Sequence, residues 1–157
     1  QNVAEEALAR QDLGYRKLLT LASPFNTALW RYVVIDDDQY YTGWYSLLDS
    51  DRDVRFTRHE RGTHLLTGLE DHWPVSRLQW FTKGFYDVSL LNGDIIMTDL
   101  RMGVEGAYVF RFKVGEMSNP HAIPTPSQSQ GQSPDLSLVP DLWKRIKGQR
   151  EGLACCL

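Results

Sequence analysis

The stretch from Ile96 to Val114 constrains the fold most, because its apolar and charged residues alternate as they do in β-strands. Gly103 and Gly106 favour a chain reversal over residues 102–106, since glycine readily adopts the positive φ of tight turns. The reversal predicts an antiparallel hairpin with three cross-strand pairs. These pairs are Arg101 with Ala107, Asp99 with Val109, and Met97 with Arg111.

The predicted hairpin has one apolar face and one charged face. The apolar face is expected to form a wall of the core and contains Ile96, Thr98, Leu100, Tyr108, Phe110, Phe112 and Val114. The charged face contains Asp99, Arg101, Arg111 and Lys113. Asp99, Arg101 and Arg111, with Lys83 and Tyr86 near the same end of the sheet, form the candidate binding site. Two arginines beside a lysine can clamp a carboxylate or a phosphate, although a solvated face with cross-strand ion pairs gives the same pattern.

Composition limits the protein to a few classes. With 157 residues and 42% hydrophobic content, the chain is large enough for one domain with a buried core. A net charge of -3 argues against a nucleic-acid surface, which normally carries an excess of basic residues. The two cysteines are adjacent, at Cys155 and Cys156, and this spacing does not match a zinc site. No run of about 18–20 apolar residues is present, so the sequence predicts no membrane span within the chain.

Alternation and turn signals predict an α+β fold, with a mainly antiparallel sheet of about six strands packed by one or two helices. Asn92-Gly93 is a strong signal for the turn between two of these strands. Helical spacing is expected over residues 2–21 and within residues 63–84. Strands are expected at Thr27–Ile35, Tyr40–Tyr45, Val54–Arg58, Phe85–Leu91, Asp94–Arg101 and Ala107–Val114.

Four segments are predicted along the chain. Residues 1–22 form an N-terminal helix, and the start on Gln1 within a helical pattern indicates a piece of a longer protein. Residues 23–117 form the α+β domain. Residues 118–140 are rich in Pro, Ser and Gln, a composition typical of a flexible or disordered linker. Residues 141–157 contain a short helix and a tail.

One acidic pattern resembles a cation site. The spacing of its four carboxylates matches the ligands of a calcium-binding helix-loop-helix. These carboxylates belong to Asp49, Asp51, Asp53 and Glu60. Val54 occupies the position where such a loop needs glycine, so the polar tip of a hairpin explains the pattern better.

The histidines and the nucleophilic side chains give no catalytic prediction. His59 and His64 are five residues apart, about 140° around a helix, so they and His72 are not expected to share a metal. The sequence has no Gly-x-Ser-x-Gly motif, no phosphate-binding glycine loop and no internal cysteine. We therefore predict neither a catalytic residue nor a metal ligand.

Six short motifs occur in order between Pro24 and Val114. They are Pro24-Phe25-Asn26, Leu29-Trp30, Tyr40-Tyr41-Thr42-Gly43-Trp44, Phe81-Thr82-Lys83-Gly84-Phe85-Tyr86, Asp99-Leu100-Arg101-Met102-Gly103 and Tyr108-Val109-Phe110-Arg111-Phe112. Together they resemble the soluble C-terminal part of a family of bacterial inner-membrane proteins. This family is described as the YdjM-like, LexA-regulated, membrane-bound metal-dependent hydrolases.

The resemblance implies a parent protein with several transmembrane helices before Gln1, so that residues 1–22 lead from an absent membrane portion. It also implies that the parent binds a divalent metal through His-Arg and Thr-His-Ser motifs in that portion, which this chain lacks. The chain is then expected to be an extramembrane accessory domain of an inner-membrane hydrolase, without a cofactor of its own.

Three functions are compatible with these observations. In the first, an accessory domain positions an unknown small-molecule or protein ligand through the candidate binding site on the charged face. In the second, the chain itself binds a divalent metal through the four acidic residues and hydrolyses a phosphoester. In the third, exposed Trp and Tyr side chains mediate self-association. None of the three involves nucleic acid.

Overall fold

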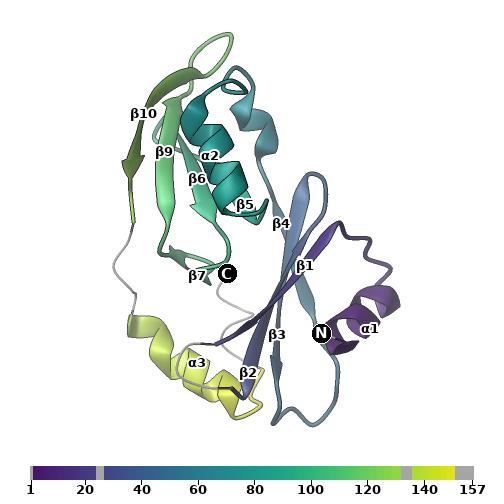
Figure 1. Cartoon of the computed structure of the whole chain (residues 1–157). Helices are drawn as coiled ribbons and strands as arrows, with labels where there is room; N and C mark the ends of the chain where they lie inside the picture. Colours follow the sequence, from purple (N-terminus) through teal and green to yellow (C-terminus); the bar gives the residue numbers. More distant parts are fainter. Residues whose placement is uncertain (1, 24–26, 132–135, 151–157) are drawn as a thin grey trace. The chain divides into compact units, whose positions relative to one another are not determined.

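The computed structural model describes residues 2–23, 27–131 and 136–150, which divide into two compact units (Figure 1). Unit 1 comprises residues 1–59 and 136–157, and unit 2 comprises residues 60–135. The predicted α+β class with antiparallel pairing is confirmed. In place of the expected sheet of about six strands, the described residues form two four-stranded sheets and one two-stranded sheet. In the described ranges, no helix is both long enough and apolar enough to cross a membrane.

Unit 1 contains an N-terminal helix, a four-stranded sheet and a C-terminal helix. Along the chain these are α1 (Asn2–Arg10), β1 (Lys17–Ala22), β2 (Leu29–Ile35), β3 (Gln39–Ser46), β4 (Phe56–Glu60), a 3₁₀ turn (Leu136–Leu138) and α3 (Val139–Ile146). The strands lie in the order β1-β2-β3-β4. Successive side chains of a strand point to opposite faces, so odd and even positions of β2 meet different neighbours.

The two helices of unit 1 contact opposite faces of this sheet. Ala4 and Ala7 of α1 pack against Tyr32 in one buried cluster. On the other face, the hydroxyl of Ser46 donates a hydrogen bond of 2.6 Å to the backbone oxygen of Ile146 in α3. Gly43 lies on the α1 face, where a Cβ would come within 2.8 Å of a Val54 methyl, so glycine permits this close packing.

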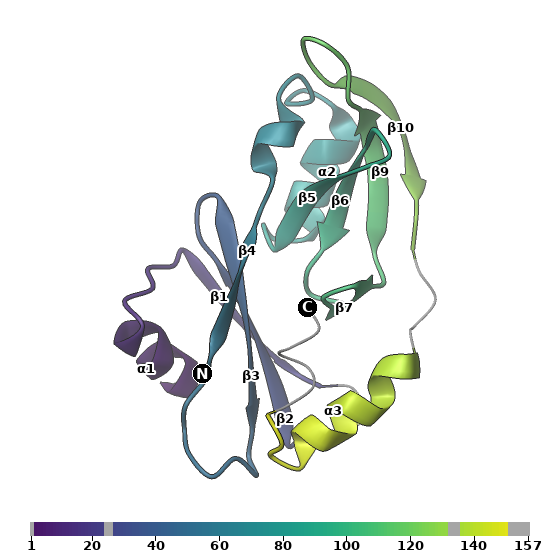
Figure 2. The ribbon, with the colours of Figure 1, turned by 180° about the vertical axis from the view of Figure 1, so that it is seen from behind.

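Unit 2 packs one helix on a second antiparallel sheet, as Figure 2 shows from behind. Its elements are a 3₁₀ turn (Thr63–Leu66), α2 (Trp73–Phe81), β5 (Tyr86–Leu91), β6 (Asp94–Asp99), β7 (Gly103–Val104), β8 (Ala107–Tyr108), β9 (Arg111–Glu116) and β10 (Ile123–Ser129). The four-stranded sheet has the order β10-β9-β6-β5, and β7 pairs with β8. The core contains Val75 and Leu78 of α2 with Tyr86, Val88, Ile95, Met97 and Val114.

The turn predicted at Asn92-Gly93 is confirmed. It joins β5 to β6, and Asn92 and Gly93 have φ values of 53° and 89°. Both values lie in the left-handed region that two-residue hairpin turns require. Local chemistry was therefore sufficient to place this turn.

The predicted helices are shorter than expected. The helix over residues 2–21 ends at Arg10, and Asp12 adopts a φ of 53° that breaks the helix. Residues Lys17–Ala22 instead pair with β2 along their whole length, because tertiary pairing outweighs a helical pattern. Within residues 63–84, only a 3₁₀ turn and α2 are helical.

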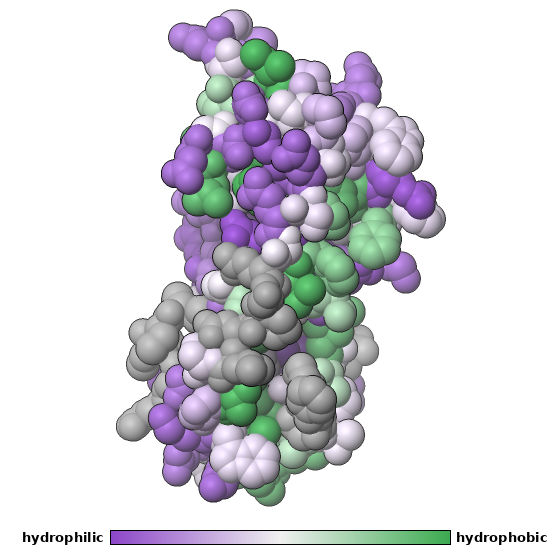
Figure 3. Space-filling view, turned by 90° about the vertical axis from the view of Figure 1, so that its left-hand side faces the viewer, coloured by the Kyte–Doolittle hydropathy of each residue, from purple (hydrophilic) through white to green (hydrophobic). Residues whose placement is uncertain are grey.

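The predicted linker at residues 118–140 contains an ordered strand. Its central part, β10, pairs with β9 at the edge of the unit 2 sheet. Pro124 and Pro126 are compatible with this place, because an edge strand leaves one side of its backbone unpaired. Hydrophilic side chains predominate on the side of unit 2 that carries β10 (Figure 3). Residues 132–135 lie outside the described ranges.

The predicted register of the central hairpin is wrong by one residue. In the structure, Met97 pairs with Phe112 and Thr98 pairs with Arg111. The backbone N–H of Asp99 donates 2.9 Å to the oxygen of Phe110, which keeps this register, whereas the N–H of Val109 donates 3.1 Å to the oxygen of Met102 in a different register. The turn assumed at residues 102–106 is instead the small β7–β8 hairpin, which adds a residue between the paired strands.

This shift moves the β6 side chains to the opposite face relative to those of β9, because a one-residue slip turns every side chain of one strand to the other side of the sheet. Met97 and Ile95 lie in the core cluster with α2. Ile96 and Thr98, which were assigned to the core wall, lie on the opposite face with Lys113 and Arg111. The predicted apolar wall is therefore not formed as expected.

Candidate functional site

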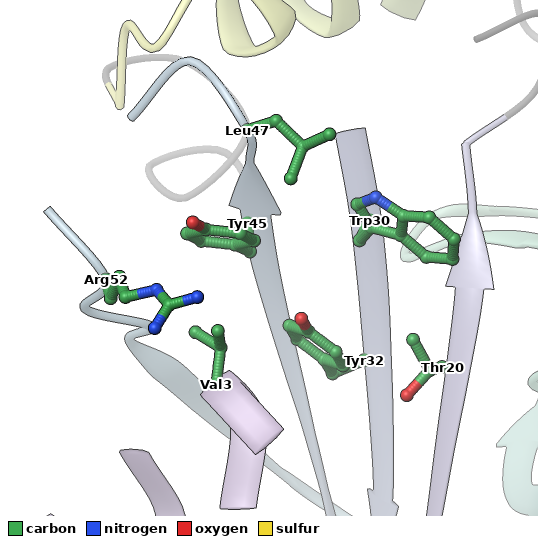
Figure 4. A pocket seen from close by; sticks show the side chains of 7 residues that line it. All are labelled: Val3, Thr20, Trp30, Tyr32, Tyr45, Leu47 and Arg52. Carbon is green, nitrogen blue, oxygen red and sulfur yellow. The ribbon is translucent and has the colours of Figure 1, made fainter. Parts of the chain in front are cut away.

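A pocket of about 290 Å³ opens beside α1 on the sheet of unit 1 (Figure 4). Three aromatic side chains and one arginine account for most of its chemical character. The lining residues are Val3, Thr20, Trp30, Tyr32, Tyr45, Leu47 and Arg52. Concave sites with mainly apolar walls and a few polar groups are the usual form of small-molecule sites.

Strand register brings the aromatic side chains together. Trp30 of β2 is paired with Tyr45 of β3, and Thr20 of β1 is paired with Tyr32 of β2. All four positions therefore share the face that α1 covers, and Val3 closes this face from the helix. Regular strands hold the walls, which favours a preformed pocket over one created by loop movement.

Two polar groups of the lining, the Tyr32 hydroxyl and the Arg52 guanidinium, can orient a bound ligand. Burial, followed by the nearby Tyr45, raises the pKa of Tyr32 above its ordinary value of 10.0, so its hydroxyl stays neutral at physiological pH. A neutral hydroxyl can both donate and accept a hydrogen bond. Arg52 is exposed, and Figure 4 shows its guanidinium directed toward the space between Tyr45 and Val3. The pocket thus combines apolar walls with a cation at its edge.

Asp99 and Arg101 of the predicted binding site form a closed pair. The guanidinium of Arg101 donates to both carboxylate oxygens of Asp99, at 2.6 Å for the shortest contact. The Asp99 side chain is 1% exposed, and the Arg101 guanidinium also lies 4.9 Å from the ring centroid of Phe81. The paired carboxylate raises the pKa of Arg101 further above its ordinary value. This geometry is typical of a structural ion pair.

Of the other predicted site residues, Tyr86 lies next to this pair, as the cross-strand neighbour of Asp99. Tyr86 is buried, accepts a hydrogen bond from Gln79, and has the Arg61 guanidinium 4.6 Å from its ring centroid. Lys83 is exposed after α2 with a φ of 55°. Arg111 pairs with Thr98 and so lies on the face opposite Asp99. The prediction of one charged face containing both Arg101 and Arg111 is therefore wrong.

Arg111 belongs instead to a polar group centred on Asp87. Asp87, Thr98 and Arg111 are cross-strand neighbours on β5, β6 and β9. Burial raises the pKa of Asp87 to about 6, a shift that the hydrogen bond from Thr98 and the charge of Arg111 partly oppose. The Oδ1 atom of Asp87 is buried and has no hydrogen-bond partner in the described ranges. Asp87 is thus held where its ionised form is disfavoured.

This environment predicts a pH-dependent stability. The folded chain keeps the Asp87 proton up to about pH 6, whereas the unfolded chain releases it near 3.8. The folded state therefore binds more protons between these values, and stability should fall by up to about 3 kcal/mol as pH rises through this window. Asp87→Asn should remove this contribution and gain stability relative to the unmodified chain between pH 4 and pH 7. Urea unfolding across this range measures the effect.

Asp38→Asn is the matched control, because Asp38 is an exposed carboxylate in unit 1. The free energy of unfolding of this variant should change with pH in the same way as that of the unmodified chain from pH 4 to pH 7. A parallel profile for Asp87→Asn would show that burial of Asp87 does not determine its ionisation.

The carboxylates of Asp49, Asp51 and Asp53 in unit 1 are paired with arginines and do not form an open cation site. Arg145 donates to both oxygens of Asp49, at 2.6 and 2.7 Å. Arg150 pairs with Asp51, and Arg10 pairs with Asp53 at 3.2 Å. Positive side chains at these carboxylates compete directly with a metal ion. In the described ranges, no three His, Cys, Asp or Glu side chains are grouped so that they could hold one.

Two of the histidines that were considered as metal ligands, His59 and His72, contact other residues of the chain. His59 stacks on Tyr40 with ring centroids 4.7 Å apart, and its Nε2 lies 3.1 Å from the hydroxyl of Thr42. The Nε2 of His72 lies 2.9 Å from the backbone oxygen of Thr125. These contacts are typical of histidines that help to hold the fold.

The pocket was not among the predicted sites, although the sequence contains its signal. Trp30 and Tyr32 alternate on one strand, and Tyr45 lies on the next strand of the same predicted hairpin. The pairing of Trp30 with Tyr45 could not be assigned before the register was known. No protein-family model, curated protein or solved structure was found to match this chain.

Proposed function

We propose that this chain is a ligand-positioning accessory domain of a membrane-bound metal-dependent hydrolase, and that the aromatic pocket of unit 1 holds the ligand. The pocket, with Trp30, Tyr32 and Tyr45 on rigid strands, is the observation that carries the binding role. The six ordered sequence motifs are what support the hydrolase parent. This proposal moves the binding site from the charged face of unit 2 to unit 1.

The lining predicts the ligand's chemistry. Flat apolar groups gain both burial and ring contacts beside Trp30 and Tyr45. Within the described ranges, no carboxylate forms an ion pair with Arg52, so its guanidinium can accept an anionic group. The proposed ligand is therefore a small molecule with an aromatic or apolar body and one carboxylate or phosphate.

Calorimetric titration with 2-naphthoate and 2-naphthalenemethanol tests this proposal, because the two probes share a ring system and differ in charge. Both should bind, and the anion should bind more tightly. Arg52→Gln should reduce the affinity for 2-naphthoate alone, by about two- to fivefold. Trp30→Ala should weaken both probes by about tenfold or more.

Two further variants control this experiment. Leu47 is exposed at the pocket, so Leu47→Trp should fill the opening and weaken both probes without disturbing the fold. Trp143→Ala removes an exposed tryptophan of α3 that is outside the pocket lining, and it should change neither affinity. If all four variants bound both probes with the affinity of the unmodified chain, the pocket would be refuted as the ligand site. Independently, the coding sequence before Gln1 should contain several apolar spans of about 20 residues.

A further inference from the structure

Helix α2 of unit 2 presents tryptophans to solvent. Trp73 is 72% exposed and Trp80 is 68% exposed, and their spacing of seven residues places them on one side of the helix. Phe81 continues this exposed side at the end of the helix. The opposite side of α2 supplies Val75 to the core of unit 2. The fold therefore does not require the tryptophans for its own packing.

Positive side chains accompany these rings. The guanidinium of Arg77, one turn from each tryptophan, lies 4.6 Å from the ring centroid of Trp80. Lys83 is exposed just after the helix. We name the surface formed by Trp73, Arg77, Trp80, Phe81 and Lys83 the α2 face. It combines large aromatic rings with cations in a chain whose net charge is -3.

We infer that the α2 face binds the interface of an anionic phospholipid bilayer. Tryptophan is favoured at the headgroup level of membranes, where its ring meets apolar chains and its N–H meets polar groups. Arg77 and Lys83 can pair with lipid phosphates while their aliphatic stems cover the apolar layer. This inference concerns unit 2 and does not depend on the pocket of unit 1.

Charge favours a lipid surface over a second copy of the chain. In a twofold dimer, the same surface meets itself, so Arg77 and Lys83 would approach the like charges of the partner. An anionic bilayer instead offers opposite charge over the whole surface. Self-association through the same tryptophans is therefore an outcome that the experiment must distinguish.

Co-sedimentation of the full chain with vesicles tests the inference. Vesicles of phosphatidylglycerol and phosphatidylcholine should bind the chain more tightly than vesicles of phosphatidylcholine alone, and added salt should weaken binding. The double variant Trp73→Ala, Trp80→Ala should lower the partition coefficient by about tenfold or more. Arg77→Gln should lower it by about two- to fivefold on the anionic vesicles.

Trp143→Ala is the matched control, because it removes a similarly exposed tryptophan from unit 1 and should leave vesicle binding unchanged. Urea unfolding should give unchanged stability for every variant, since all altered side chains are exposed. The inference is overturned if the chain does not bind anionic vesicles, or if Trp143→Ala weakens vesicle binding as much as the double variant does. It is also overturned if light scattering shows a dimer that the double variant abolishes.

Discussion

Arg145→Ala is expected to lower the free energy of unfolding by about 3–5 kcal/mol. Arg145 and Asp49 are 5% and 0% exposed, and Arg145 also donates 3.0 Å to the backbone oxygen of Trp44. Its removal leaves a buried carboxylate that still accepts a hydrogen bond of 2.9 Å from the backbone N–H of Ser46. Such a charge is expensive to hold away from water. Urea denaturation at neutral pH measures the loss.

The neighbouring Lys144 supplies the control for this prediction. Lys144 pairs with Asp141 on the surface of the same helix, at 3.0 Å. Lys144→Ala should cost less than about 1 kcal/mol, because exposed ion pairs contribute little. Equal costs for the two variants would mean that the Arg145–Asp49 pair does not anchor α3 to the sheet.

Arg101→Ala is expected to destabilise unit 2 by a similar amount, about 3–5 kcal/mol. It removes the guanidinium hydrogen bonds to both oxygens of the buried Asp99 carboxylate and the contact with the Phe81 ring. The free energy of unfolding of Arg101→Lys should lie between those of the unmodified chain and Arg101→Ala, because one ammonium cannot reproduce the two parallel bonds of a guanidinium. Chemical denaturation of the three proteins gives the comparison.

Arg16→Ala is the appropriate comparison for Arg101, since Arg16 forms an exposed ion pair with Asp37. Its effect should stay below about 1 kcal/mol. If Arg101→Ala were equally mild, the Asp99–Arg101 pair would be dispensable for folding. A ligand-binding role for these two residues would then have to be considered again.

Local signals predicted the parts of the fold that depend on local chemistry. The Asn92-Gly93 turn was placed correctly, because its backbone conformation follows from the residues themselves. The division into two sheets was not predicted, since strand patterns indicate strands without identifying their partners. The strand at Lys17–Ala22 was assigned to a helix, because its pairing with β2 is a long-range contact.

The candidate site depended on register, and this is where sequence reasoning failed. An error of one residue between β6 and β9 joined Arg111 to Asp99, although they lie on opposite faces. The change of register between the Asp99–Phe110 and the Met102–Val109 hydrogen bonds has no signature in the alternation of residues 96–114. The same dependence on cross-strand pairing concealed the pocket around Trp30 and Tyr45.

Nuclear magnetic resonance mapping of 2-naphthoate on the ¹⁵N-labelled chain tests the central claim, which is that unit 1 holds the ligand. We expect saturable amide shifts concentrated at Val3, Thr20, Tyr32 and Leu47, with no comparable shifts at Asp99 in unit 2. Shifts centred on the Asp99 region, or no saturable shifts at millimolar probe, would contradict it.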